Sequence, residues 1–198
     1  MTSKYSKGAE WRKWDLHVHT PYSIYQKYGA DNDVTWEKFI TDLENLSEEY
    51  AVIGVNDYLF LDGYQKLIDE QKKNNRLQRL TLFPVVEFRI EKFAGVEFGD
   101  LKRINLHVIF SNELSVETIK SQFLNTLEQS YVLETGEPWT RAITLQSVEE
   151  LGASIKASVP QEKLPDFGAD LTEGFNNLNV KEDQIFESLR KDCFKDKY

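Results

Sequence analysis

Three histidines and two carboxylates stand at positions where their side chains could bind a metal ion. His17 and His19 form a His-x-His pair within residues 14–19, where apolar and polar residues alternate as they do in a β-strand. In a strand that rises about 3.3 Å per residue, both imidazoles lie on one face, about 7 Å apart at the backbone. Two neutral imidazole nitrogens in this arrangement can converge on one divalent ion. The pair therefore predicts a metal site at the end of the first strand.

Further candidate ligands accompany three later apolar segments. Asp57 follows the buried strand predicted near residues 51–55, Glu87 follows the strand predicted for residues 80–86, and His107 lies within a fourth predicted strand. Ligands gather where the carboxyl ends of parallel strands meet, so we expect these side chains to lie near the histidine pair. Taken alone, Asp57 is also a common helix cap or turn former, and Glu87 an ordinary solvated carboxylate. Asp57 and Glu87 therefore indicate a metal site only when they are considered together with the histidines.

The elements that must position these ligands are predicted from periodicity. Apolar residues recur at helical spacing after Thr35, which we expect to be an N-cap, and again in two later segments. Strands that alternate with helices predict an α/β fold with a mostly parallel sheet. Beyond Gly136 we expect helices near residues 147–151 and 180–189, separated by a loop rich in Pro, Gly and Asn, and no strong strand.

Composition excludes several classes of protein. The chain has 198 residues, 40% of them hydrophobic, and no apolar run approaches the roughly 20 residues of a membrane span. Its polar beginning lacks the apolar stretch of a signal peptide, so we expect a cytoplasmic protein that does not associate with membranes. A single cysteine, Cys193, excludes an internal disulfide. The net charge of −9 argues against a broad surface that coats nucleic acid, and no phosphate-loop motif is present.

The segments that hold the candidate ligands resemble the four motifs of the PHP (polymerase and histidinol phosphatase) superfamily. They are Trp14-Asp15-Leu16-His17-Val18-His19-Thr20-Pro21-Tyr22-Ser23, Asn56-Asp57-Tyr58, Pro84-Val85-Val86-Glu87 and Leu106-His107-Val108-Ile109. Residues 10–14 and 56–64 are most similar to the PHP domain at the N-terminus of large AAA-like ATPases of the TrlF type. The resemblance covers about residues 8–110.

This resemblance implies an incomplete, distorted (β/α)7 barrel of PHP type, with mostly parallel strands, that binds divalent Zn, Mn or Fe. Such domains hydrolyse phosphate esters, and some are nucleases. His17, His19 and Glu87 would bind the first ion, and Asp57 and His107 would complete neighbouring positions. Asp57 and Glu87 would be the catalytic carboxylates. The substrate would be a phosphate ester or a nucleic acid, and the partner an AAA-like ATPase module.

The residue pattern and the resemblance together suggest how the chain is divided. Residues 1–13 would form an N-terminal arm, and residues 14–135 the front portion of the PHP-like α/β domain. Residues 136–198 would be a mainly helical and loop segment of the same domain, which would end before the last strands. An open parallel sheet must be covered, either by residues 136–198 as a helical lid or by a second copy of the chain. We expect association into a homo-oligomer.

Two departures from the family pattern bear on activity. Tyr58 stands where the superfamily usually has a histidine ligand, and no histidine follows His107, although the family's later ligands include histidines. We therefore expect at most one loosely held ion and weak or no turnover by this chain alone. The alternative hypothesis is a catalytically degenerate PHP-like domain that serves as an interaction or regulatory module. Metal content and phosphodiester hydrolysis in Mn²⁺ would discriminate between the two.

Overall fold

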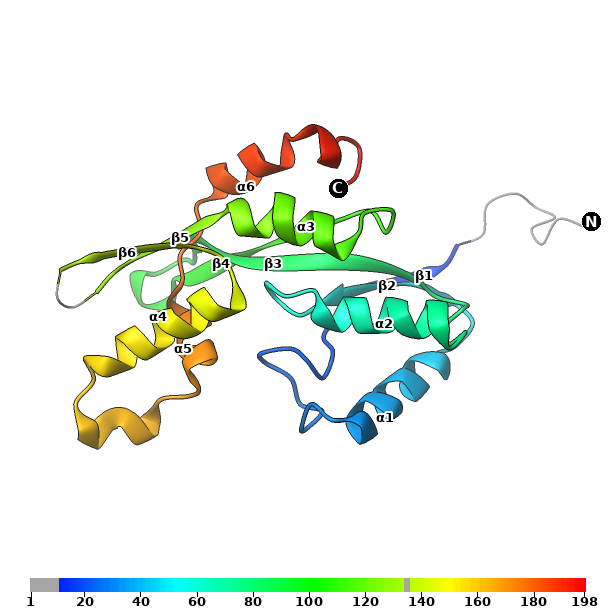
Figure 1. Cartoon of the computed structure of the whole chain (residues 1–198), viewed down its shortest axis with the longest axis horizontal. Coiled ribbons are helices and arrows are strands. Elements are labelled where there is room, and N and C mark those ends of the chain that lie inside the picture. Colours follow the sequence, from blue (N-terminus) through cyan, green and yellow to red (C-terminus); the bar gives the residue numbers. More distant parts are fainter. Residues whose placement is uncertain (1–10, 134–135) are drawn as a thin grey trace, which may run out of the picture.

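The computed structural model describes residues 11–133 and 136–198, apart from the side chain of Phe98, and the long strand β3 runs through its centre (Figure 1). The strands are β1 (Lys13–Val18), β2 (Tyr50–Asn56), β3 (Thr81–Ala94), β4 (Lys102–Ile109), β5 (Glu128–Val132) and β6 (Pro138–Ala142). The α-helices are α1 (Asp33–Glu44), α2 (Asp62–Lys73), α3 (Val116–Gln122), α4 (Leu145–Ala157), α5 (Asp170–Asn177) and α6 (Glu182–Leu189). Residues 1–10, most of the predicted arm, lie outside the described residues. Within the described residues, no helix has the length and apolar character needed to cross a membrane.

Four strands form the main sheet, in the order β1-β2-β3-β4. β1 pairs with β2 and β2 pairs with β3 in parallel, so the predicted α/β fold with a mostly parallel sheet is confirmed. β4 is instead antiparallel to β3, with Glu87 opposite His107. The reason is the short connection at residues 95–101, because a parallel crossover needs a dozen or more residues. Among the described residues, these four strands do not close into a barrel.

An aromatic cluster covers the face of β3 that carries Phe88. Phe88 and Phe110 pack against Phe123, with ring centroids 5.8 and 5.0 Å away, and Phe194 packs against Phe123 at 6.0 Å. All four side chains are fully buried. Burying one such side chain contributes about 1.5–3 kcal/mol, so the cluster anchors α3 and the C-terminal turn to this face of the sheet. Successive residues of a strand alternate in direction, so Glu87 points to the opposite face.

Residues 136–198 fold back onto the sheet, which agrees with the alternative in which this segment covers the sheet as a helical lid. Val180 pairs in parallel with Ile90, beyond the part of β3 that pairs with β2. Phe175 of α5 and Phe194 are buried in the same hydrophobic core as the first half of the chain. This segment therefore covers apolar surface of the sheet without a second copy. The expected homo-oligomer stays a prediction.

Two expectations about where elements begin and end are wrong. Asn32, rather than Thr35, is the N-cap of α1, and its side chain accepts a hydrogen bond from the Thr35 N–H at 3.0 Å. β6 pairs with β5 as an antiparallel hairpin, although no strong strand is expected beyond Gly136. Trp139 is the single buried residue of β6. One buried side chain in five residues is too weak a signal for a strand to be predicted.

α5 occupies a segment that is expected to be a loop, and two glycines explain the difference. A Cβ atom at Gly152 of α4 would lie 1.8 Å from the carbonyl oxygen of Asp170, and one at Gly174 of α5 would lie 1.8 Å from the carbonyl oxygen of Val148. These glycines let α4 and α5 cross in backbone contact, which no larger residue permits. Glycine here marks close helix packing and not a turn.

Candidate metal centre

Three side chains from three strands converge at the carboxyl end of β1. The ligand atoms of His17, Glu87 and His107 all lie within 4.8 Å of one another. The Nε2 atom of His17 is 3.5 Å from Oε2 of Glu87, and the Nε2 atom of His107 is 3.3 Å from the same oxygen. The side chain of Glu87 is only 2% exposed, whereas those of His17 and His107 are 49% and 31% exposed. The group therefore combines a buried carboxylate with two imidazoles that solvent can reach.

Strand pairing explains how two of these ligands meet. Glu87 and His107 are direct partners across the antiparallel pair of β3 and β4, so their side chains project from the same face. His17 comes from β1, on the far side of β2. The pairing of β1 with β2 is irregular between Asp15 and Val18, and this bulge redirects the side chains of the strand.

The close approach of β1 to β2 depends on Gly54. A Cβ atom at this position would lie 2.7 Å from both the Cα atom and the carbonyl oxygen of Leu16. Such a contact is shorter than packed atoms allow, so only glycine lets the bulged strand lie this close. Gly54 therefore helps to carry His17 toward the other two ligands.

Two asparagines hold the Glu87 carboxylate. Asn56 Nδ2 donates to Oε2 at 2.6 Å, and Asn105 Nδ2 donates to Oε1 at 2.5 Å. Both carboxylate oxygens thus have a partner, as a buried charged group requires. Amide donors of this kind fix the orientation of a ligating carboxylate. The sequence interpretation missed both asparagines, although Asn105 lies two residues before His107 and alternation alone places it on the same face of β4.

His19 lies beside the three-residue group but is not part of it, and its role as a ligand of the same ion stays a prediction. Its Nε2 atom is 3.1 Å from Nε2 of His17, and its Nδ1 atom is 3.0 Å from the hydroxyl of Ser23. Burial lowers the pKa of His19, and the neighbouring His17 lowers it further. His19 is therefore held as a neutral imidazole, the form that binds metal ions.

Asp57 lies outside this group, and its carboxylate is turned toward the loop after β1. Thr20 donates its backbone N–H to Oδ1 at 2.8 Å and its hydroxyl to Oδ2 at 2.7 Å. The side chain is buried, and burial raises the pKa of Asp57 to about 6 despite these two hydrogen bonds. Asp57 thus fastens the segment that carries His19 to the end of β2. Its roles as metal ligand and catalytic group stay predictions.

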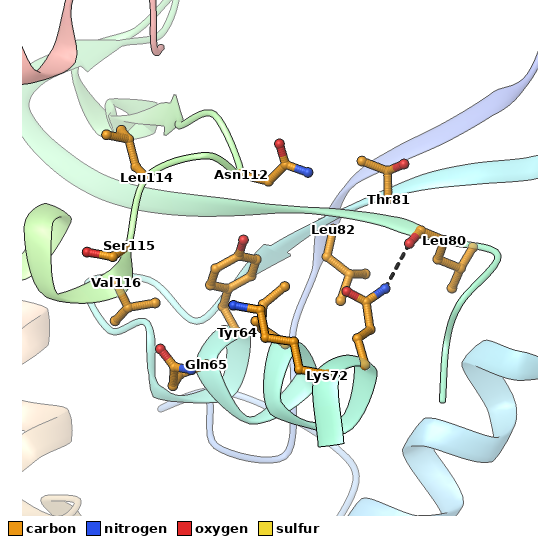
Figure 2. A pocket seen from close by; sticks show the side chains of 12 residues that line it. Tyr64, Gln65, Lys72, Leu80, Thr81, Leu82, Asn112, Leu114, Ser115 and Val116 are labelled. Atoms are coloured by element: carbon orange, nitrogen blue, oxygen red, sulfur yellow. Dashed lines mark hydrogen bonds between the residues drawn. The ribbon is translucent and has the colours of Figure 1, made fainter. Parts of the chain in front are cut away.

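Two cavities lie near the sheet, and one of them adjoins the histidines. His17 and His19 line a cavity of about 410 Å³ between β1 and α1. Another, of about 340 Å³, lies between α2, the start of β3 and the loop before α3 (Figure 2). Tyr64 and Lys72 extend toward it from α2. None of the candidate ligands lines this second cavity, and neither Glu87 nor His107 lines the first.

Comparisons with known proteins leave the chain without an assigned family. No protein-family model, no curated protein and no solved structure matches it.

Proposed function

We propose that this chain is a metal-dependent phosphoester hydrolase domain of the PHP type, with His17, Glu87 and His107 as its principal metal ligands. The observation that carries the proposal is the convergence of two imidazole nitrogens and one buried carboxylate oxygen from three separate strands. The order of the motifs along the chain and the mostly parallel sheet support the assignment. On this proposal the four strands correspond to the front of a distorted (β/α)7 barrel.

The residues fit a divalent ion. Ligands about 2.1 Å from a tetrahedral ion lie about 3.4 Å from one another. The distances of 3.5 and 3.3 Å from the Glu87 oxygen to the two histidine nitrogens agree with that value. The whole group spans up to 4.8 Å, so the two imidazoles would move closer together on binding an ion. Two imidazoles and a carboxylate are a donor set that suits Zn, Mn and Fe. His19 offers another neutral nitrogen next to His17.

A bound ion would supply Lewis acidity and lower the pKa of a coordinated water toward neutrality. The protein contributes the positioning. Asn56 and Asn105 hold the Glu87 carboxylate in one orientation, so that its Oε2 atom stays directed at the two histidines. The half-exposed His17 and partly exposed His107 leave the opposite side of the centre open to a substrate.

One observation favours the alternative of a domain without catalytic activity. The Tyr58 ring packs against His19 at 4.8 Å and against Phe175 at 4.7 Å between centroids. Burial raises the pKa of Tyr58, and the charge of Glu87 raises it further, so the phenol stays neutral and is a poor ligand. A centre that binds an ion but does not hydrolyse phosphate esters would fit this second proposal.

Metal titration of a matched pair of variants tests the centre. We expect the wild-type chain, freed of metal with EDTA, to bind about one Zn²⁺ or Mn²⁺ ion in calorimetric titration at pH 7.5. E87Q should weaken binding by about tenfold or more, because a neutral amide replaces the anionic ligand. E91Q, an exposed position on the same strand, should bind as the wild type does.

Hydrolysis of bis(4-nitrophenyl) phosphate in Mn²⁺ then separates the two functions. Slow turnover that disappears in E87Q supports the hydrolase, and binding without turnover supports the regulatory module. A wild-type chain that binds neither ion, or an E87Q variant that binds equally well, would overturn the metal centre itself.

A further inference from the structure

Two arginines lie on the same face of the sheet as the Glu87 carboxylate. Arg89 follows Glu87 by two residues on β3, which places it on the same face, about 7 Å farther along the strand. Its direct partner on β4 is Asn105, the residue that donates to Glu87. Arg103 precedes Asn105 by two residues on β4 and therefore shares this face as well.

Neither guanidinium is neutralised within the described part of the chain. Arg89 donates to the side-chain oxygen of Asn176 at 3.0 Å, and Arg103 donates to the carbonyl oxygen of Leu178 at 3.3 Å. Both acceptors are uncharged, and neither arginine takes part in an ion pair among the described residues. Arg76 shows the contrast, because it forms ion pairs with two glutamates. Each guanidinium has five N–H donors, so most donors of both arginines have no described partner.

The two positive charges are close enough to influence each other. Burial lowers the pKa of Arg103, and the charge of Arg89 lowers it further, while Glu91 acts in the opposite direction. Two half-buried like charges repel each other, and Glu91 offsets part of this repulsion without forming an ion pair with Arg103. An anionic ligand would remove this repulsion and use the free donors.

Aromatic side chains hold Arg89 in place. Its guanidinium carbon lies 4.9 Å from the centroid of the Phe175 ring and 5.9 Å from that of Tyr25. The Tyr25 hydroxyl donates at 2.8 Å to the same Asn176 oxygen that accepts from Arg89. A guanidinium fixed by stacking and a hydrogen bond loses little entropy when it binds a ligand. Arg89 is thus prepared for recognition and differs from a mobile surface arginine.

We propose that Arg89 and Arg103 together bind a phosphate group of the substrate, next to the His17, Glu87 and His107 centre. Guanidinium groups match phosphate oxygens in charge and in geometry, because two parallel N–H donors can reach two oxygens. The inference rests on the proposed hydrolase. It adds that the anionic group of the phosphate ester substrate is bound by these two arginines. The phosphate belongs either to a small ester or to a nucleotide chain, and both share this chemistry.

Phosphate binding in the absence of metal tests the proposal independently of the hydrolase. We expect inorganic phosphate to bind the wild-type chain saturably in calorimetric titration with EDTA at low salt. R89M and R103M should each weaken binding by about tenfold or more, because each removes charge-assisted hydrogen bonds. R141M is the matched control, because Arg141 lies on β6, away from the centre, and its loss changes the net charge equally.

One further variant and two further ligands separate the possible explanations of a change in phosphate binding. R89K retains the charge but not the planar fork, and it should bind phosphate more weakly than the wild type with an unchanged thermal midpoint. Adenosine monophosphate and a short single-stranded oligonucleotide, titrated in the same way, distinguish a small ester from a nucleotide chain.

Absence of saturable phosphate binding by the wild-type chain, or equal weakening by R141M, would overturn the arginine site. Zn²⁺ titration of R89M should match the wild type, since Arg89 is not a ligand. Failure of the wild type to bind Zn²⁺ with phosphate binding intact would reject the hydrolase and leave the anion site standing.

Discussion

The buried carboxylate of Asp57 makes the stability of the fold depend on pH. Its pKa rises from the usual 3.8 to about 6 on folding, primarily because burial disfavours the charged form. The folded chain therefore holds this proton more tightly than the unfolded chain. The resulting stabilisation is fully present below about pH 4 and is lost as the pH rises through about 6. Each unit by which the pKa rises corresponds to about 1.4 kcal/mol, so the protonated carboxyl stabilises the fold by about 3 kcal/mol in total. About 1.4 kcal/mol of this stabilisation is lost between pH 5 and 7.5.

Substitution D57N removes this titration while keeping the shape of the side chain. The Thr20 N–H can still donate to Oδ1, and the new amide can donate to the Thr20 hydroxyl, which then acts as acceptor. Urea unfolding of both chains at pH 5 and 7.5 gives the free energies. Between pH 5 and pH 7.5, we expect the free energy of unfolding to fall by about 1.4 kcal/mol more in the wild type than in D57N.

The surface variant D42N serves as control and should follow the wild type, because Asp42 is exposed and paired with Lys38. The same pH dependence in the wild type and in D57N would refute the reasoning. It would mean that the buried carboxylate is as easily ionised in the folded chain as in the unfolded one.

Two further predictions concern packing around the centre and in the core. G63A should destabilise the fold by about 1–3 kcal/mol, because its Cβ would lie 2.0 Å from Oδ2 of Asp57 and 2.3 Å from the hydroxyl oxygen of Thr20; a thermal midpoint equal to that of the wild type would contradict this. F123A should cost about 3–5 kcal/mol in urea unfolding, because the ring is fully buried among other aromatic rings. The half-exposed Phe186 gives the control F186A, and a loss as large as that of F123A would show that burial is not the cause.

Local pattern was sufficient to predict most of the first half of the fold. The continuous apolar run before Asn56 predicts a strand buried on both faces, and β2 is such a strand. The His-x-His pair predicts that His17 and His19 lie together, and their Nε2 atoms are 3.1 Å apart. Both features depend on neighbours in the sequence, which is why they could be inferred from it.

Features that depend on contacts between distant segments could not be inferred in this way. The hydrogen bonds of Asn56 and Asn105 to Glu87 require a particular register of three strands, which no single segment specifies. Gly152 and Gly174 resemble loop formers until the helices that carry them are placed against each other. The antiparallel direction of β4 was not inferred either, because the predicted strand ended at residue 86, whereas β3 continues to Ala94 and leaves only a short connection to β4.

The pairing of Glu87 with His107 has a consequence for the order in which the centre assembles. These two ligands lie on adjacent antiparallel strands joined by a short connection, so the loop that must close to bring them together is small and forms early. His17 arrives only when β1 pairs with β2 over a much longer stretch of chain, a step that is intrinsically slower. A probe that responds to all three side chains would therefore report the completion of the sheet, and one that responds to the Glu87 and His107 pair alone would report its first hairpin.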